Sequence, residues 1–115
     1  MKNIFCAAFI TVIAAPLVAA ELASGDQIMS TISGNTVQGG MSDGSAYTEY
    51  YDTDGTIKGA NYTGAWSVEG DTMCFDYGEG KNCWGVAIED DMVTWMNGDT
   101  ADGSGTVLTG NPNDF

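Results

Sequence analysis

Two cysteines on either side of a short glycine-containing stretch, Cys74 and Cys83, constrain the fold of this chain more than any other feature. A tetrahedral metal site would need two more ligands, and the sequence contains no His. If the two cysteines face each other across an antiparallel hairpin, Gly78-Glu79 becomes a two-residue loop that suits a type II′ turn. We therefore predict a Cys74–Cys83 disulfide between neighbouring strands.

The turn signals on both sides of this hairpin agree with the same register. With Gly70-Asp71 and Asp90-Asp91 as loops, the large apolar side chains of four strands fall on one face, which we predict to be the core. These residues are Trp66, Val68, Met73, Phe75, Trp84, Val86, Ile88, Val93 and Trp95. The disulfide lies on the opposite face, where Asp76 and Lys81 are predicted to form a cross-strand ion pair.

Turn residues recur about every ten positions from Thr36 onward, which favours an all-β meander over alternating strands and helices. A short helix is predicted to precede the strands. Ser24 provides an N-cap, Gly34-Asn35 ends the helix, and Ile28, Met29 and Ile32 share one apolar stripe. The predicted strands cover residues 36–39, 46–51, 56–59, 64–69, 72–77, 80–89, 92–97 and 105–109, with Asp102-Gly103 as the turn before the last.

The fold class predicted from these elements is all-β, an antiparallel meander of seven or eight strands with one short N-terminal helix. One shared apolar face favours closure into a small barrel, which removes exposed strand edges, with the helix at one end. An open sheet with the helix across its apolar face is the alternative.

The first twenty residues have the pattern of an export signal. Lys2 precedes an apolar run from Ile4 to Val18, and small residues end at Ala20. Pro16 and the length of the run argue against a membrane anchor. We predict a cleaved signal peptide over residues 1–20 and a single barrel-like domain over 21–115, exported to a bacterial periplasm or beyond the cell.

The predicted mature chain is strongly acidic. All sixteen Asp and Glu residues follow the signal, against Lys58 and Lys81, which gives a net charge of 2 − 16 = −14. Nucleic acid and anionic membrane surfaces are poor partners for such a surface. Cations and basic protein surfaces remain compatible with it.

Candidate sites for chemistry are few. Asp52-Thr53-Asp54-Gly55 resembles part of a calcium loop. The positions that correspond to the first and last ligands of such a loop are not acidic in this chain, so a hairpin turn is favoured. Glu49, Asp52 and Asp54 are therefore only weak metal candidates. Without His or Arg the chain lacks an ordinary triad, so we expect no enzyme activity and no cofactor.

Four tyrosines, Tyr47, Tyr50, Tyr51 and Tyr62, are the binding candidates. Strand alternation places Tyr47 and Tyr51 on one face and Tyr50 on the other. Exposed aromatic side chains can form a recognition patch. Ordinary strand composition is the alternative, because Tyr suits a half-buried pleated surface.

Gly64-Ala65-Trp66, followed by Gly70-Asp71 and Cys74, resembles a pattern of small exported bacterial β-barrels. Lipocalin-like and avidin-like barrels carry Gly-x-Trp on a strand, and periplasmic inhibitors of secreted metalloproteases combine such a barrel with one disulfide. The resemblance assigns no functional residue. The leading hypothesis is a non-enzymatic exported module that binds a small ligand or an exported protein, with a hydrolase inhibitor and a weak divalent-cation binder as alternatives.

Overall fold

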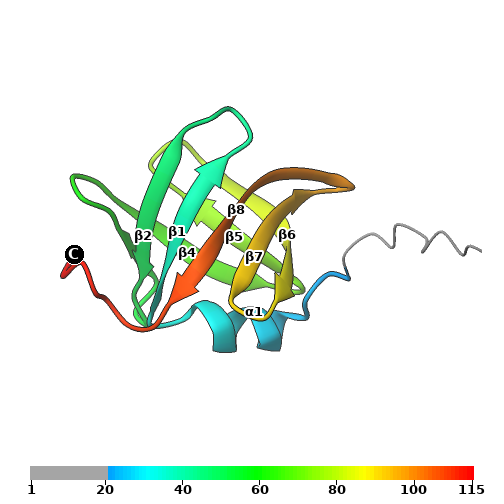
Figure 1. The fold of residues 1–115 in the computed structure, drawn as a ribbon, viewed down its shortest axis with the longest axis horizontal. Coiled ribbons are helices and arrows are strands. Elements are labelled where there is room, and N and C mark those ends of the chain that lie inside the picture. The colour runs from blue at the N-terminus through cyan, green and yellow to red at the C-terminus, as the bar shows by residue number, and fades with distance from the viewer. Residues whose placement is uncertain (1–20) are drawn as a thin grey trace, which may run out of the picture.

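In the computed structural model, which describes residues 21–115, eight antiparallel strands close into a barrel and one helix lies across one end (Figure 1). The predicted signal peptide, residues 1–20, lies outside the described residues. The elements are α1 (Gly25–Ile32), β1 (Asn35–Met41), β2 (Ala46–Tyr51), β3 (Thr56–Lys58), β4 (Thr63–Glu69), β5 (Thr72–Asp76), β6 (Lys81–Glu89), β7 (Met92–Asn97) and β8 (Thr100–Leu108). Each strand pairs with its neighbours in sequence, and β1 pairs with β8. The predicted closed barrel is confirmed, and the open sheet is wrong.

The register predicted from the three turns is also confirmed. Cys74 lies opposite Cys83, and the two sulfur atoms form a disulfide. In the adjoining pairs, Trp66 faces Phe75 and Val86 faces Trp95. Gly70, at the β4–β5 turn, has a φ of 61°, a conformation that favours glycine. The turn chemistry thus fixes which face of each strand is turned inward.

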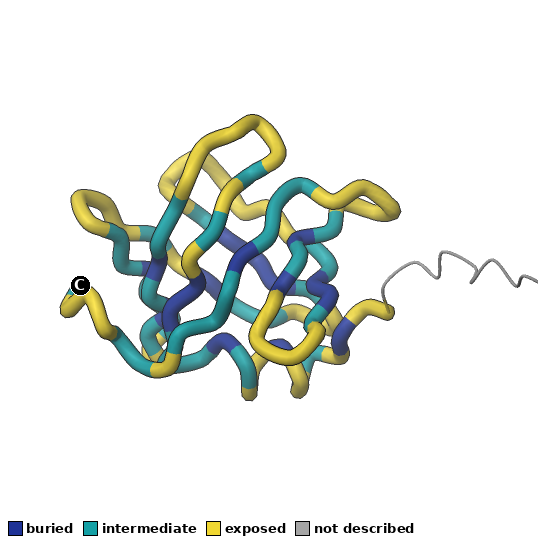
Figure 2. Tube along the Cα trace, in the orientation of Figure 1, coloured by how far each residue is buried: buried dark blue, intermediate teal, exposed yellow. Residues whose placement is uncertain are grey.

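All nine predicted core residues belong to the core. Six are buried, and the other three, Val68, Trp84 and Ile88, are partly buried and pack against them. Figure 2 shows the buried positions along the strands and the exposed ones in the loops. The core continues into the strands upstream, where Val37, Tyr51 and Ile57 are fully buried.

Helix α1 closes one end of the barrel, where it packs against β1, β4 and β5. The Ser24 hydroxyl caps it by accepting a hydrogen bond from the Gln27 amide over 3.2 Å, as predicted. Ile28 and Ile32 are fully buried beneath the barrel. Met29 was predicted to lie on the same apolar stripe, but it is 44% exposed. Residues four apart, such as Ile28 and Ile32, lie on the same face of a helix, whereas Met29 directly follows Ile28 and points in a different direction.

Two details differ from the prediction. Lys81 forms its ion pair with Glu69 of β4 rather than with Asp76 directly opposite. The Asp76 carboxylate instead accepts a hydrogen bond from the Gly78 amide over 2.8 Å and so stabilises the β5–β6 connection. That connection comprises residues 77–80, two more than the predicted loop.

The second difference concerns Asp102-Gly103, which was predicted to be a turn and lies within β8. A register shift between Trp95 and Met96 lets the β7–β8 pairing continue to Asn97 opposite Thr100.

Within residues 21–115 no helix has the length and apolar character needed to cross a membrane.

Candidate functional site: the barrel cavity

The barrel interior is not completely filled. A cavity of about 210 Å³ lies among side chains from β1, β2, β5, β6 and β7 and from the β5–β6 connection. Its lining consists of Met41, Tyr47, Glu49, Tyr51, Phe75, Tyr77, Trp84 and Trp95. Met41 ends β1 and Tyr77 follows β5, so the cavity lies toward the end of the barrel opposite α1 (Figure 1). Aromatic walls with few polar groups are typical of small-molecule sites.

Two glycines on β8 make room for side chains that line this cavity. A Cβ atom at Gly103 would lie 2.6 Å from the sulfur of Met41, and one at Gly105 would lie 2.6 Å from the hydroxyl oxygen of Tyr47. Both distances are below van der Waals contact, so the Met41 and Tyr47 side chains occupy space that a larger residue would take. Glycine at these two positions of β8 lets the long side chains of Met41 and Tyr47 lie inside the barrel.

Glu49 is the one acid among the residues that line the cavity, and it is 6% exposed. Three tyrosine hydroxyls donate to its carboxylate. Tyr51 donates to Oε1 over 2.7 Å and Tyr62 to Oε2 over 2.6 Å, while Tyr77 lies 3.0 Å from both oxygens. These donors come from β2, from the β3–β4 connection and from the β5–β6 connection. The curvature of the barrel wall between β2 and β6 therefore brings them together.

The tyrosines are held in their protonated form. Burial raises the pKa of Tyr47 to about 12, opposed by the hydrogen bond from Trp95 and aided by the charge of Glu49. Burial, followed by the hydrogen bond to Glu49 and the charge of Glu49, also raises the pKa of Tyr62. For Tyr51 and Tyr77, burial and then the charge of Glu49 raise the pKa. A protonated phenol can donate to a carboxylate, whereas a phenolate would repel it.

The indole donors at the cavity are already engaged. Trp84 Nε1 donates to the Asp102 carboxylate over 2.9 Å, and Trp95 Nε1 donates to the Tyr47 hydroxyl over 2.8 Å. Tyr47 in turn donates to the carbonyl oxygen of Ser104 over 2.9 Å. Throughout the described residues, every buried side-chain nitrogen or oxygen has a hydrogen-bond partner. The cavity thus offers aromatic surface and a carboxylate, and its own donors are bonded to protein acceptors.

Three of the four predicted binding tyrosines meet at this site. Tyr47 and Tyr51 line the cavity, and Tyr62 holds Glu49. Tyr50 lies on the outer face by alternation and takes no part. Tyr77 is not among the predicted binding residues, and Glu49 was predicted only as a weak metal candidate rather than as the centre of the site. The alternation Tyr47-Thr48-Glu49-Tyr50-Tyr51 carried a signal for it, because it puts Glu49 on the same face as two tyrosines.

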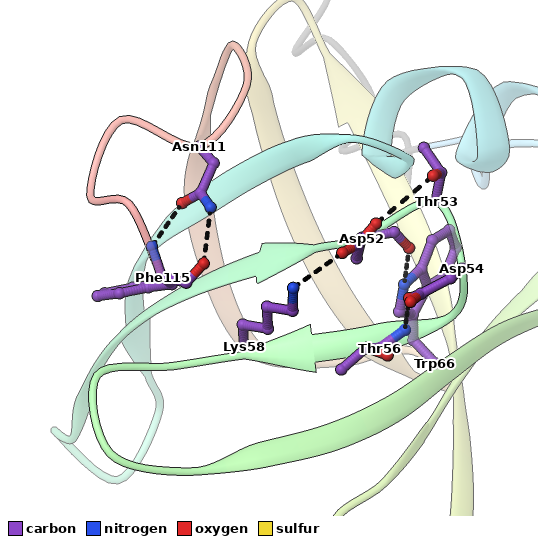
Figure 3. A network of polar contacts seen from close by, with 8 residues as sticks. All are labelled: Asp52, Thr53, Asp54, Thr56, Lys58, Trp66, Asn111 and Phe115. Atoms are coloured by element: carbon purple, nitrogen blue, oxygen red, sulfur yellow. Dashed lines mark hydrogen bonds and ion pairs between the residues drawn. The ribbon is translucent and has the colours of Figure 1, made fainter.

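The three weak metal candidates are engaged in separate contacts, and Figure 3 shows those of Asp52 and Asp54. Glu49 is bound by tyrosines in the interior, whereas Asp52 pairs with Lys58 over 3.0 Å and Asp54 accepts from the Thr56 amide over 2.9 Å. The Asp52 carbonyl also accepts from Trp66 Nε1 over 2.9 Å. Both turn acids thus stabilise the β2–β3 hairpin, as turn-forming Asp residues do.

Among the described residues, one group contains three His, Cys, Asp or Glu side chains close enough to share an ion: Glu69, Cys74 and Cys83. The two sulfur atoms are joined in the disulfide and are not thiolates, so they are poor metal ligands. The Glu69 carboxylate is paired with Lys81.

Comparisons with known proteins add no assignment to this geometry. The resemblance to lipocalin-like and inhibitor-like barrels therefore stays an expectation, and the function has to be inferred from the residues of the cavity. None of the family models, curated proteins or solved structures compared with the chain matches it.

Proposed function

We propose that this protein is a non-enzymatic binding module that holds a small organic molecule in the barrel cavity. The observation that carries the proposal is the aromatic cavity of about 210 Å³ with one buried carboxylate in its wall. Stacking and apolar contact with Phe75, Trp84 and Trp95 would supply affinity, and Glu49 would orient the ligand. A barrel that only presented an outer surface to a protein would gain nothing from such a cavity.

The two alternative functions have less support. An inhibitor of an exported hydrolase needs a protruding or flat contact surface, and two of the four tyrosines predicted as a surface patch, Tyr47 and Tyr51, line the cavity instead. A divalent-cation site built from turn acids would need free carboxylates, but Asp52 and Asp54 are engaged in the β2–β3 hairpin.

Export is part of the proposal. The Cys74–Cys83 disulfide is compatible with an oxidising compartment, and the apolar stretch over residues 1–20 is the expected signal peptide. A periplasmic or extracellular module of this kind would meet its ligand outside the cytoplasm.

Calorimetric titration of the protein with small single-ring compounds tests the proposal. The first compound is the neutral 2-phenylethanol. Met41→Trp should abolish binding, because the larger side chain fills space in the cavity that Met41 lines. Met92→Trp is the matched control, since Met92 is 44% exposed on the outer face. Binding that survives Met41→Trp, or no binding of any single-ring probe to the wild type, would contradict the proposal.

A further inference from the structure

The charge of Glu49 has no compensating cation in the described structure. The two lysines among residues 21–115 form ion pairs elsewhere, Lys58 with Asp52 and Lys81 with Glu69. Burying a carboxylate without a positive partner is costly even when it is hydrogen-bonded. The tyrosine hydroxyls reduce this cost by hydrogen bonding, but they leave a net negative charge in the cavity wall.

The hydrogen bonds to Glu49 are also incomplete. A carboxylate has about four lone-pair sites. Three hydroxyls bring three protons, and Tyr77 shares its proton between the two oxygens at 3.0 Å each. The carboxylate therefore receives one proton fewer than it can accept, and a charged donor can replace one of the two long contacts that Tyr77 shares. The cavity side of Glu49 is where such a donor would come from, because the residue lines the cavity.

The aromatic walls of the cavity also favour a positively charged ligand. Phe75 packs edge-on against Trp84 and Trp95, with ring centroids 5.6 and 5.3 Å apart. Aromatic faces attract cations, most strongly the indole ring. The donors of Trp84, Trp95 and Tyr47 are bonded to Asp102, Tyr47 and Ser104, so an anionic ligand would find no free donor among them.

The net negative charge of the whole chain also favours a positively charged ligand. The full chain has a formal net charge of −13 at pH 7. A field of this sign raises the local concentration of small cations and lowers that of anions. Asp102, which holds Trp84, adds a carboxylate close to one lining residue.

We infer that the cavity takes a small organic cation, an aromatic or alkyl ammonium whose N–H group bonds to Glu49 while its apolar part packs against the rings of Phe75, Trp84 and Trp95. This inference rests on the proposed function, because it names the ligand class for the same cavity. Glu49 supplies the counter-charge and an acceptor site that Tyr77 only shares, and the tyrosines hold its carboxylate in position.

The experiment compares three probes that share one ring and differ in charge: phenethylammonium, 2-phenylethanol and phenylacetate. Calorimetry on the wild type is carried out in about 1 M NaCl, which screens the exposed acids but not a buried pair. Phenethylammonium should bind at least about tenfold more tightly than the alcohol, and phenylacetate should bind most weakly. This comparison needs no variant, so it stands even if a substitution at Glu49 prevents folding.

Glu49→Gln then removes the charge and keeps the size of the side chain. It should weaken phenethylammonium binding about tenfold or more and change 2-phenylethanol binding by less than about threefold. Glu89→Gln removes an equal charge from an exposed position on β6 and should alter neither affinity.

The outcomes separate the two proposals. If 2-phenylethanol or phenylacetate binds as tightly as phenethylammonium, the ammonium inference is overturned and the cavity is still a binding site. If phenethylammonium keeps its full affinity in a folded Glu49→Gln variant, the inference is likewise overturned. If none of the three probes binds the wild type, the proposed function fails together with it.

Discussion

The indole nitrogen of Trp95 donates a hydrogen bond over 2.8 Å to the hydroxyl of Tyr47, a residue 48 positions earlier in the chain. The same hydroxyl donates to the Ser104 carbonyl over 2.9 Å. One oxygen atom thus joins β7, β2 and β8 inside the barrel. Since Trp95 is only 4% exposed, its N–H has little access to water if this partner is removed.

Tyr47→Phe should therefore destabilise the barrel. The substitution leaves the Trp95 N–H without its acceptor and the Ser104 carbonyl without one donor. We expect the free energy of unfolding to fall by about 1–3 kcal/mol, measured by urea denaturation. Tyr50→Phe removes a hydroxyl from the outer face of the same strand and should cost less than about 0.5 kcal/mol. Equal losses in the two variants would show that the interior hydrogen bonds contribute nothing specific.

The disulfide joins cysteines nine positions apart within one hairpin. A loop this short restricts the unfolded chain by about 2–3 kcal/mol in the chain-entropy account. Reduction should lower the unfolding free energy by that amount and leave the far-ultraviolet circular dichroism unchanged, because the β5–β6 pairing is maintained by its backbone hydrogen bonds. Cys74→Ala combined with Cys83→Ala should behave as the reduced protein does. Loss of the β-sheet signal on reduction would contradict this expectation.

The central strands were predictable because their turns are chemically explicit. Gly70 adopts a φ of 61° and Asp90 one of 56°, and Asp is among the few other residues that tolerate this region. Once three turns are fixed, alternation assigns every inward side chain between Trp66 and Trp95. Sequence reasoning failed at β8, where Asp102-Gly103 has the composition of a turn but the register shift after Trp95 carries the pairing past it.

The site was less predictable than the fold, because its groups come from separate parts of the chain. Alternation turns Glu49 inward, but it does not show that Tyr62 and Tyr77 reach the carboxylate from two loops. The ion pair of Lys81 was predicted wrongly for the same reason. Lys81 pairs with Glu69 on β4, across β5, rather than with Asp76 directly opposite. Such contacts depend on the curvature and closure of the barrel, which a local pattern does not encode.

Alkaline pH should destabilise the protein through its interior tyrosines. In the unfolded chain a tyrosine ionises near its ordinary pKa of 10.0, whereas burial raises the pKa of Tyr47 to about 12 in the folded protein. Because the folded state keeps its proton longer, the stability contributed is complete below pH 10 and is lost as the pH rises from 10 through about 12. Urea denaturation should show a constant midpoint up to about pH 9 and a falling one above pH 10.

The ultraviolet absorbance of phenolate distinguishes the ionisation of tyrosine from that of lysine. Ionisation of Tyr47, Tyr51, Tyr62 and Tyr77 should occur at higher pH in the folded protein than in urea. This readout is needed because the pKa of Lys58 is also raised, by its hydrogen bond to Asp52, and would lower the stability over a similar range. Coincident phenolate titrations in the folded and unfolded states would overturn the prediction.

Two adjacent glycines of β1 should differ sharply in their tolerance of a methyl group. A Cβ atom at Gly39 would collide with the Ser104 carbonyl and lie 2.5 Å from the Gly105 Cα, both backbone atoms of β8 that cannot move aside. At Gly40 the nearest neighbour of such an atom is the Ser45 carbonyl oxygen at 3.5 Å, an ordinary contact. Gly39→Ala should therefore cost about 3 kcal/mol or prevent folding, whereas Gly40→Ala should change the unfolding free energy by less than about 1 kcal/mol. Thermal and urea denaturation of the two variants measure this difference. A Gly39→Ala variant that folds with wild-type stability would mean that β1 and β8 do not approach so closely where they pair to close the barrel.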